Sequence, residues 1–307
     1  MDIIKNRYIF FILSGVLILA SIFAFYFFGV KQGIDLAGGT SWQIQITNSA
    51  VNEGSLKSVL AEIVAANNSN SSDFVIKSLP DKNFLIRLPT ISEESHQKYY
   101  QALQAKFGEV KEGGFQSIGP TIGQELRQRF IWAFIIGLIG ILLYVAWAFR
   151  KVSFPIKSWK YGVIVVLCGF HDIIVPIGIM AFLGWNKGIE IDTNFIVALM
   201  FILGYSINDT IVVFDRIREN LVLAHRGNFD FAGLINAAVK QTFARSVSTS
   251  LTTVLAIAPL YFIGPLSLKY FILTLMLGII VGSYSSIFIA SPLLYVWHPI
   301  KAKNKVK

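Results

Sequence analysis

Six long apolar runs constrain the fold of this chain more than any other feature of its sequence. Each run is near or above the roughly 20 residues that an α-helix needs to cross a bilayer. The runs cover residues 8–30, 130–149, 161–185, 193–214, 246–268 and 270–297. Hydrophobic residues make up 54% of the chain, which is too many for a soluble globular domain. The sequence therefore predicts a polytopic α-helical membrane protein with six transmembrane helices, the first retained rather than cleaved as a signal peptide.

The distribution of basic residues predicts the orientation of these helices. Between residues 31 and 127, nine Lys and Arg are balanced by ten Asp and Glu, whereas the short segments beside the runs carry excess positive charge. The positive-inside rule then places both termini in the cytoplasm and residues 31–127 outside. The net charge of +9 reflects this topology and contact with anionic membrane lipid, and it does not indicate a nucleic-acid partner.

The region between the first two runs is long enough for one small domain. Its pattern predicts the order strand, helix, strand, strand, helix, strand, at residues 42–46, 51–66, 74–76, 84–88, 92–107 and 113–118. A polar loop is expected over 67–72, and Pro80-Asp81-Lys82-Asn83 is a turn signal between the two middle strands. This order is typical of the ferredoxin-like α+β fold.

The chain is thus predicted to have four parts. A cytoplasmic N-terminus and the first transmembrane helix occupy residues 1–30, and an extracytoplasmic α+β domain occupies 31–128. A five-helix transmembrane bundle follows over 129–298. The chain ends in a basic cytoplasmic tail over 299–307, which contains Lys301, Lys303, Lys305 and Lys307.

No cluster of metal-ligating or nucleophilic residues occurs in the predicted domain. His96 is its only histidine and has no Cys or acidic companion at ligand spacing, so an exposed helical position is expected. Cys168 is the only cysteine of the chain, which rules out an internal disulfide and favours a packing role. The domain is therefore predicted to be a binding or mechanical module, with no enzyme activity and no cofactor.

Ionisable residues inside the apolar runs are the strongest functional signal. Asp209 lies in the fourth run and His171-Asp172 in the third, while Arg245 stands at the start of the fifth. An ionised carboxylate in hydrocarbon costs roughly 2.5–3.5 kcal/mol, so it needs a partner, a proton or a water-filled cavity. Asp209 and Arg245 start from similar depths, which makes an ion pair feasible. These four residues are predicted to form a proton relay in which that ion pair is exchanged for a proton.

A structural role is the alternative for the same residues. A buried carboxyl that only fixes helix packing through hydrogen bonds would explain Asp209 or Asp172 as well. Asn208 and Thr210 are interpreted as packing and hydrogen-bonding residues beside Asp209. Outside the runs, Asp35 is near enough in sequence to satisfy the turn that Gly38-Gly39 permits.

These residues carry a resemblance to the SecF family, the smaller membrane subunits of bacterial SecDF complexes, over nearly the whole chain. GIDLAGGT (33–40) resembles the family's motif after the first span, and GPTIGQEL (119–126) resembles the one before the second. His171-Asp172 matches a third-span pair, while GYSINDTIVVFDRIREN (204–220) and ARSVSTSLTT (244–253) closely match the fourth and fifth spans. Leu36, where many members have Phe, is a mild departure. The motif residues are Asp35, Gly38, Gly39, Thr40, Gly119, Pro120, Asn208 and Thr210.

The resemblance implies membership of the RND superfamily and a place in the bacterial cytoplasmic (inner) membrane. It implies a complex with SecD, contact with the SecYEG channel and YajC, and translocating preprotein as cargo. Protons, or else sodium ions, would be the coupling ion. In the family, the carboxylate matching Asp209 and the arginine matching Arg245 belong to the proton route.

Two other function classes stay open on the sequence. One is half of an RND-type small-molecule exporter, because six spans with one outer domain are half of the usual complement. The other is a non-energised scaffold for translocon assembly, in which the intramembrane carboxyls only fix packing.

Overall fold

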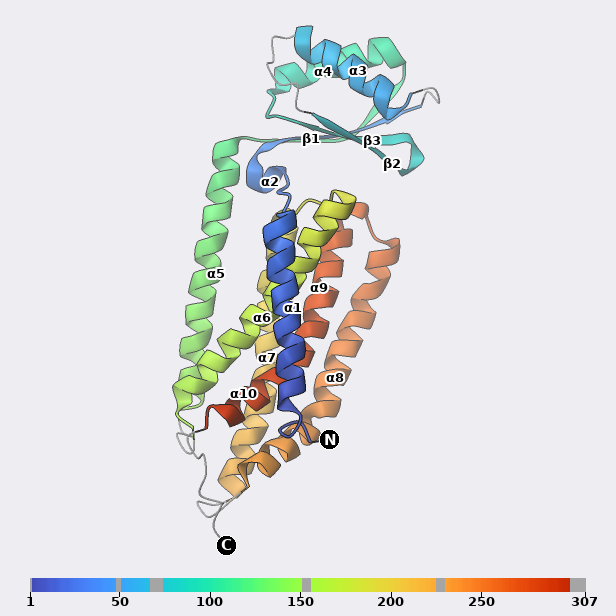
Figure 1. Ribbon diagram of the computed structural model, residues 1–307. Coiled ribbons are helices and arrows are strands. Elements are labelled where there is room, and N and C mark those ends of the chain that lie inside the picture. The colour runs from blue at the N-terminus through green and yellow to red at the C-terminus, as the bar shows by residue number, and fades with distance from the viewer. Residues whose placement is uncertain (1, 48–50, 67–73, 151–155, 225–229, 299–307) are drawn as a thin grey trace. The chain divides into compact units, whose positions relative to one another are not determined.

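The computed structural model describes residues 2–47, 51–66, 74–150, 156–224 and 230–298 (Figure 1). The chain divides into two compact units. Residues 1–31 with 132–307 make up the helical unit, and residues 32–131 make up the sheet unit. The loop predicted over 67–72 and the basic tail predicted over 299–307 lie outside the described residues.

Among the described residues, six helices are long and apolar enough to cross a membrane. Five are single elements, α1 (Arg7–Phe28), α5 (Pro120–Ala148), α6 (Ser158–Lys187), α7 (Thr193–Leu223) and α8 (Phe231–Ile263). The sixth passes through α9 (Leu266–Ser285), a π-helical turn η2 (Ser286–Ala290) and α10 (Ser291–Val296). The prediction of a polytopic helical membrane protein is confirmed.

Helices α7 and α8 extend beyond the apolar runs 193–214 and 246–268. The charged end of α7 stays helical because its side chains pair at i,i+3 spacing, Asp215 with Arg218 and Arg216 with Glu219, both at 2.8 Å. The first turns of α8 are amphipathic and bury Phe231, Ile235 and Ala238. Helical periodicity thus continues where hydropathy alone indicates an end.

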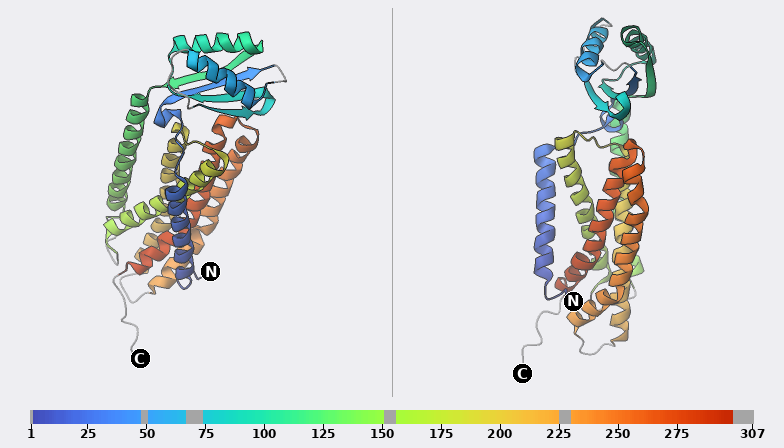
Figure 2. Two further views of the ribbon diagram at one scale, coloured as in Figure 1. Left: turned by 45° about the horizontal axis from the view of Figure 1, so that its top comes forward. Right: turned by 90° about the vertical axis from the view of Figure 1, so that its right-hand side faces the viewer.

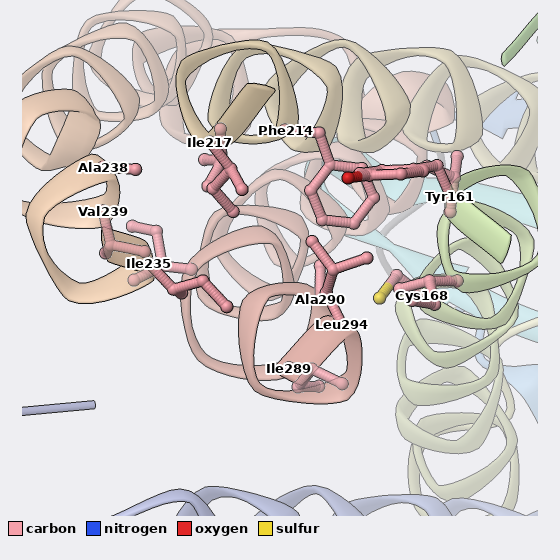
Figure 3. Close-up of a cluster of buried hydrophobic side chains, with 14 of the residues drawn as sticks. Tyr161, Cys168, Phe214, Ile217, Ile235, Ala238, Val239, Ile289, Ala290 and Leu294 are labelled. Carbon is pink, nitrogen blue, oxygen red and sulfur yellow. The ribbon is translucent and has the colours of Figure 1, made fainter. Parts of the chain in front are cut away.

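The core of the helical unit lies between α6, α7, α8 and the sixth span. Figure 3 shows Phe214 of α7 beside Tyr161 of α6, in one cluster with Cys168, Ala290 and Leu294. Cys168 is buried, as a packing residue should be. The views of Figure 2 show α8 beside α9, while α1, α5 and α8 bury few of their own residues. Helices α6 and α7 and the sixth span therefore form the inner part of the unit.

Glycines allow the closest helix contacts. A Cβ built on Gly178 of α6 would lie 2.4 Å from the Cα of Ser21 on α1, and backbone at that distance cannot yield. A Cβ on Gly278 of α9 would lie 2.2 Å from the side chain of Ile202 on α7. Gly204, in contrast, is exposed on α7 with no atom within 4 Å of such a Cβ. Small residues at helix crossings are common where packing rather than solvent exclusion holds spans together.

The sheet unit contains one antiparallel sheet with the strand order β2-β3-β1-β4. Its elements are α2 (Ile34–Ala37), β1 (Gly39–Ile46), α3 (Glu53–Ala66), β2 (Val75–Leu79), η1 (Pro80–Lys82), β3 (Asn83–Leu88), α4 (Glu93–Phe107) and β4 (Val110–Ile118). The helices α3 and α4 lie on one face of the sheet (Figure 1). Alternate residues of β1 and β3 turn toward these helices, because successive strand side chains point to opposite faces.

Buried side chains of both helices meet the sheet in a single core. Leu56 and Leu60 of α3, and Tyr99 and Leu103 of α4, pack with Trp42, Ile44, Ile46 and Ile86 of the strands. Helix α4 begins where the sequence predicts, since the hydroxyl of Ser92 accepts a hydrogen bond from the amide of Ser95. The turn at η1 is tight, with φ of 59° at Asp81 and 58° at Lys82.

The prediction that His96 is exposed and lacks an acidic companion was wrong. His96 is only 3% exposed, and its ring stacks on Phe115 at 3.7 Å. Its Nδ1 lies 3.1 Å from Oε1 of Glu93, one helical turn earlier, and its Nε2 lies 3.0 Å from Oε1 of Glu112 on β4. Hydrogen bonds from Gln97 and from His96 lower the pKa of Glu93. The imidazole thus joins α4 to the last strand.

We expect Gly178→Ala to lower the free energy of unfolding by about 1–3 kcal/mol, because the added methyl group overpacks a backbone contact. Gly204→Ala is the matched control and should leave stability unchanged or slightly raised, since alanine favours helix. Detergent titration of the purified protein, followed by circular dichroism, measures both. Equal stabilities for the two variants would contradict the close approach of α1 and α6.

Candidate functional site

Asp172 of α6 is fully buried and is held by side chains from three helices. The hydroxyl of Ser206 on α7 donates to its Oδ2, and that of Ser285 on α9 donates to the same oxygen at 2.6 Å. The Nδ1 of His171 lies 2.8 Å from Oδ1. The Nε2 of His171 is buried and has no hydrogen-bond partner among the described residues. The structure therefore brings His171 and Asp172 together, as the sequence predicts for adjacent relay residues.

Asp209 of α7 is 6% exposed and is also held by two serines. Ser246 on α8 donates to Oδ1 at 2.6 Å, and Ser286 in η2 donates to Oδ2 at 2.5 Å. Within the described part of the chain, neither carboxyl has a Lys or Arg partner. The site supplies hydroxyl hydrogen bonds to both carboxyls, and His171 is the titratable group beside Asp172.

One stretch of α9 and η2 organises the contacts around both carboxyls. Gly282 packs on Ser206 of α7, and Ser283 hydrogen-bonds Ser250 of α8. The Tyr284 hydroxyl donates to the carbonyl of Phe10 on α1 at 3.1 Å. Ser285 and Ser286 then reach Asp172 and Asp209. Five consecutive residues thus contact four different helices.

The ion pair considered between Asp209 and Arg245 is not present. Ser246 occupies the position facing Asp209, and a helix turns by about 100° per residue, so the neighbouring Arg245 points elsewhere. Arg245 is exposed, and among the described residues its guanidinium has no ion pair. The structure therefore groups three of the four predicted relay residues and leaves Arg245 on the outside of the unit.

Asn208 and Thr210 flank Asp209 but lie on different faces of α7. Thr210 is fully buried and donates to the carbonyl of Ser206 at 3.1 Å, which fits the packing role predicted for it. Asn208 is exposed, so it takes no part in the packing between the described helices of this chain. An amide that faces outward within a span indicates contact with something other than this chain or lipid.

The motif residues outside the spans meet at one point of the sheet unit. A Cβ on Gly38 would lie 2.7 Å from the Cα of Pro120 and 3.3 Å from the carbonyl carbon of Gly119, so only glycine fits there. Gly38 and Gly39 also have positive φ angles of 80° and 124°. The two motifs therefore join the beginning of this unit to its end.

Side chains of the same motifs add hydrogen bonds to this contact. Thr40 is buried, and its hydroxyl lies 2.9 Å from that of Ser117 and accepts from the amide of Ile91 at 3.2 Å. Asp35 accepts from the side chain of Gln116 at 3.4 Å. These residues are structural in the sheet unit and take no part in the carboxyl site.

The serines that hold the two carboxyls were not predicted as part of the site. The sequence does contain a signal for them, since Ser206, Ser246, Ser285 and Ser286 are polar residues inside apolar runs. A hydroxyl in such a position must find an acceptor, and a buried carboxylate is the strongest one available. Which serine meets which carboxyl depends on helix rotation, and the sequence does not give that.

Comparison with known proteins agrees with this architecture. Residues 98–299 match the family model described as protein export membrane protein SecD/SecF, C-terminal. A protein translocase subunit SecF from Thermobaculum terrenum is 39% identical, covering 96% of this chain and 93% of that protein. A SecF from Sebaldella termitidis is 36% identical, covering 99% and 94% respectively.

Solved structures show the same relationship. The crystal structure of SecDF from Thermus thermophilus, a translocon-associated membrane protein, superposes with a TM-score of 0.80 at 34% identity, covering 97% of this chain and 38% of that one. A second structure, SecDF in a super-membrane-facing form, gives a TM-score of 0.67 at 33% identity. The fold and these matches thus define a multi-pass membrane protein of the protein-export class. The chain belongs to the SecF family.

We expect Asp172→Ala to lower the free energy of unfolding by about 2 kcal/mol or more, because it removes the acceptor of two buried hydroxyls and leaves a cavity. Asp215→Ala, at an exposed position of α7, should cost less than about 1 kcal/mol. Unfolding of the purified protein by detergent titration compares the two. A loss at position 172 no larger than that at 215 would show that the network around Asp172 is not formed.

Proposed function

We propose that this protein works in protein translocation, as the SecF-type subunit of a SecDF complex that uses the proton motive force to assist preprotein passage through the SecYEG channel. The observation that carries the proposal is the pair of buried carboxyls, Asp172 and Asp209, within a chain whose relatives are named protein translocase subunits. It is a transport role and requires no catalytic residue or cofactor.

The two carboxyls suit a proton carrier because protonation removes a full charge from a poorly solvated site. Each of the four serine hydrogen bonds joins two different elements: α6 to α7 and α9, and α7 to α8 and η2. Hydrogen bonds to an ionised group are roughly twice as strong as neutral ones. Protonation of one carboxyl would therefore weaken its two attachments between helices, and in this way ion flow would move the bundle.

The exposed polar residues support SecD as the partner within the membrane. Arg245 belongs to a stripe on one face of α8 with Gln241, Ser248, Thr249 and Thr252, all of them exposed. A guanidinium facing lipid is costly, so a second membrane subunit is the natural cover for this stripe and for Asn208. The SecDF of Thermus thermophilus, of which this chain covers 37%, has such a partner part in the same polypeptide. In the complex, Arg245 would reach the proton route from this interface.

The sheet unit is assigned to the outside of the bacterial inner membrane, with both termini in the cytoplasm and domain limits at 31–128, 129–298 and 299–307. The strand order β2-β3-β1-β4, with one helix before β2 and one before β4, supports the ferredoxin-like fold for this domain. Its task in the proposal is mechanical: it would contact preprotein, while SecYEG and YajC complete the assembly.

Asp209→Asn tests the energised role, because it keeps the size of the side chain and removes the group that binds the proton. In cells depleted of the protein, this variant should fail to restore maturation of pulse-labelled preprotein. Proton flux into vesicles that contain the complex should fall by about a hundredfold, as for loss of a proton-transferring group. Asp215→Asn, the same change at an exposed position of α7, should behave as the wild type at equal membrane level.

Other outcomes favour other functions. If Asp209→Asn restores export fully while depletion abolishes it, the protein is an assembly scaffold. If depletion leaves export intact and alters sensitivity to toxic small molecules, the exporter interpretation replaces the proposal. Flux that follows sodium instead of proton gradients would change only the coupling ion.

The assignment of the SecD interface makes a separate prediction. A photoactivatable cross-linking residue at Asn208 should attach to SecD, because that position is exposed inside a span and polar. The same residue at Ile12, which is 66% exposed on α1, is the control for an apolar, lipid-facing position. Adducts with SecD are detected by immunoblotting. Equal cross-linking from both positions would contradict an interface centred on α7 and α8.

A further inference from the structure

Ser285 and Ser286 each have two hydrogen-bond acceptors within reach. The Ser286 hydroxyl lies 2.5 Å from Oδ2 of Asp209 and 3.1 Å from the carbonyl oxygen of Ser283. The Ser285 hydroxyl lies 2.6 Å from Oδ2 of Asp172 and 3.0 Å from the carbonyl oxygen of Gly282. A hydroxyl group has one hydrogen and can donate to only one acceptor at a time. Which of the two acceptors the hydroxyl uses depends on whether the carboxyl is ionised or protonated.

An ionised carboxylate only accepts hydrogen bonds, so it draws the serine hydrogen toward itself. A protonated carboxyl must itself donate, and it then needs an acceptor. If the proton sits on Oδ2 of Asp209, the Ser286 oxygen can accept it while the Ser286 hydrogen turns to the carbonyl of Ser283. Only a rotation about the Cβ–Oγ bond is required, and every polar group keeps a partner in both states.

Ser246, on the other side of Asp209, offers no such exchange. Its hydroxyl donates to Oδ1, and no second acceptor lies within reach of it among the described residues. A proton on Oδ1 would leave that hydroxyl without an acceptor in a site where Ser246 is fully buried. The two oxygens of Asp209 therefore differ in their capacity to carry a proton.

We propose that Ser286 is a two-position switch that directs the proton of Asp209 to Oδ2. The inference rests on the proposed proton-coupled function and extends it to a residue outside the predicted relay. In the proton-loading step, an O–H bond of an incoming hydronium ion breaks and one O–H bond forms at Oδ2, while the O–H bond of the serine stays intact and its hydrogen changes acceptor. Ser286 is a positioning residue, since it acts through the carboxyl of Asp209.

The π-helical turn gives this arrangement a structural basis. Ser285 is the last residue of α9, and Ser286 is the first of η2. In a regular α-helix, adjacent side chains diverge by about 100°. The wider turn of a π-helix begins at this point, and such turns occur frequently at functional sites. Adjacent serines can thus serve two carboxyls that belong to different helices.

The test compares Ser286→Ala with Ser286→Thr and Ser291→Ala, using proton flux into vesicles that contain the complete complex. Ser286→Ala removes the hydroxyl, and flux should fall by about tenfold or more, the loss expected for one charge-assisted hydrogen bond. Ser286→Thr restores a hydroxyl and should recover most of the flux. Ser291 is equally buried, but its hydroxyl has no hydrogen-bond partner among the described residues, so Ser291→Ala should match the wild type.

Two results would overturn the switch. One is wild-type flux in Ser286→Ala, and the other is equal loss in the Ala and Thr variants at normal membrane levels. If Ser286→Ala does not accumulate, Ser286→Cys replaces it, because a thiol is similar in size and a weak hydrogen-bonding group. Asp209→Asn is measured in parallel. Wild-type flux in that variant would defeat the proposed function itself, whereas its loss beside an active Ser286→Ala would defeat only the inference about serine.

Discussion

Burial of two carboxyl groups among apolar helices is the constraint on which the rest of the helical unit depends. A charged or protonated carboxyl in such a place must be hydrogen-bonded, and among the described residues no Lys or Arg pairs with either one. Hydroxyls from α7, α8, α9 and η2 meet this requirement. Because a serine side chain is short, these hydrogen bonds form only when the helices lie close together. The glycines at the helix crossings permit that close approach.

The number and position of the spans could be predicted from the sequence, because hydropathy over about 20 residues is a strong signal. The ends of the spans were harder to predict from the sequence. Hydropathy stops at Phe214, while the helix continues to Leu223 through side chains that pair with one another. The relay residues Asp209, Asp172 and His171 could be predicted because an ionisable side chain is conspicuous in an apolar run. Serine is common in membrane helices, so its role as a hydrogen-bond donor to the carboxyls can be identified only from the three-dimensional arrangement of the helices.

Arg245 and His96 both show that the sequence alone does not predict which side chains from different elements come into contact. The sequence indicated that Arg245 and Asp209 lie at similar depths in the membrane. The rotation of α8 about its axis, however, turns Ser246 toward Asp209 and Arg245 away from it. Composition suggested an isolated His96, whereas folding brought Glu112 to it from β4. In the sheet unit the pattern still sufficed to locate four strands and two helices, because β1, β3, α3 and α4 each have one buried face.

The π-helical turn has a consequence for the evolution of the sixth span. A π-turn holds one more residue than an α-helical turn, so η2 is equivalent to a single-residue insertion that the helix has absorbed. Loss of that one residue would let the segment return to a regular α-helix, with α9 and α10 each keeping its own phase. Ser291, Pro292 and Leu294 would keep their buried positions, and the change would fall on Ser286–Ala290. A single residue of chain length is therefore the difference between a regular helix and the π-turn that begins at Ser286.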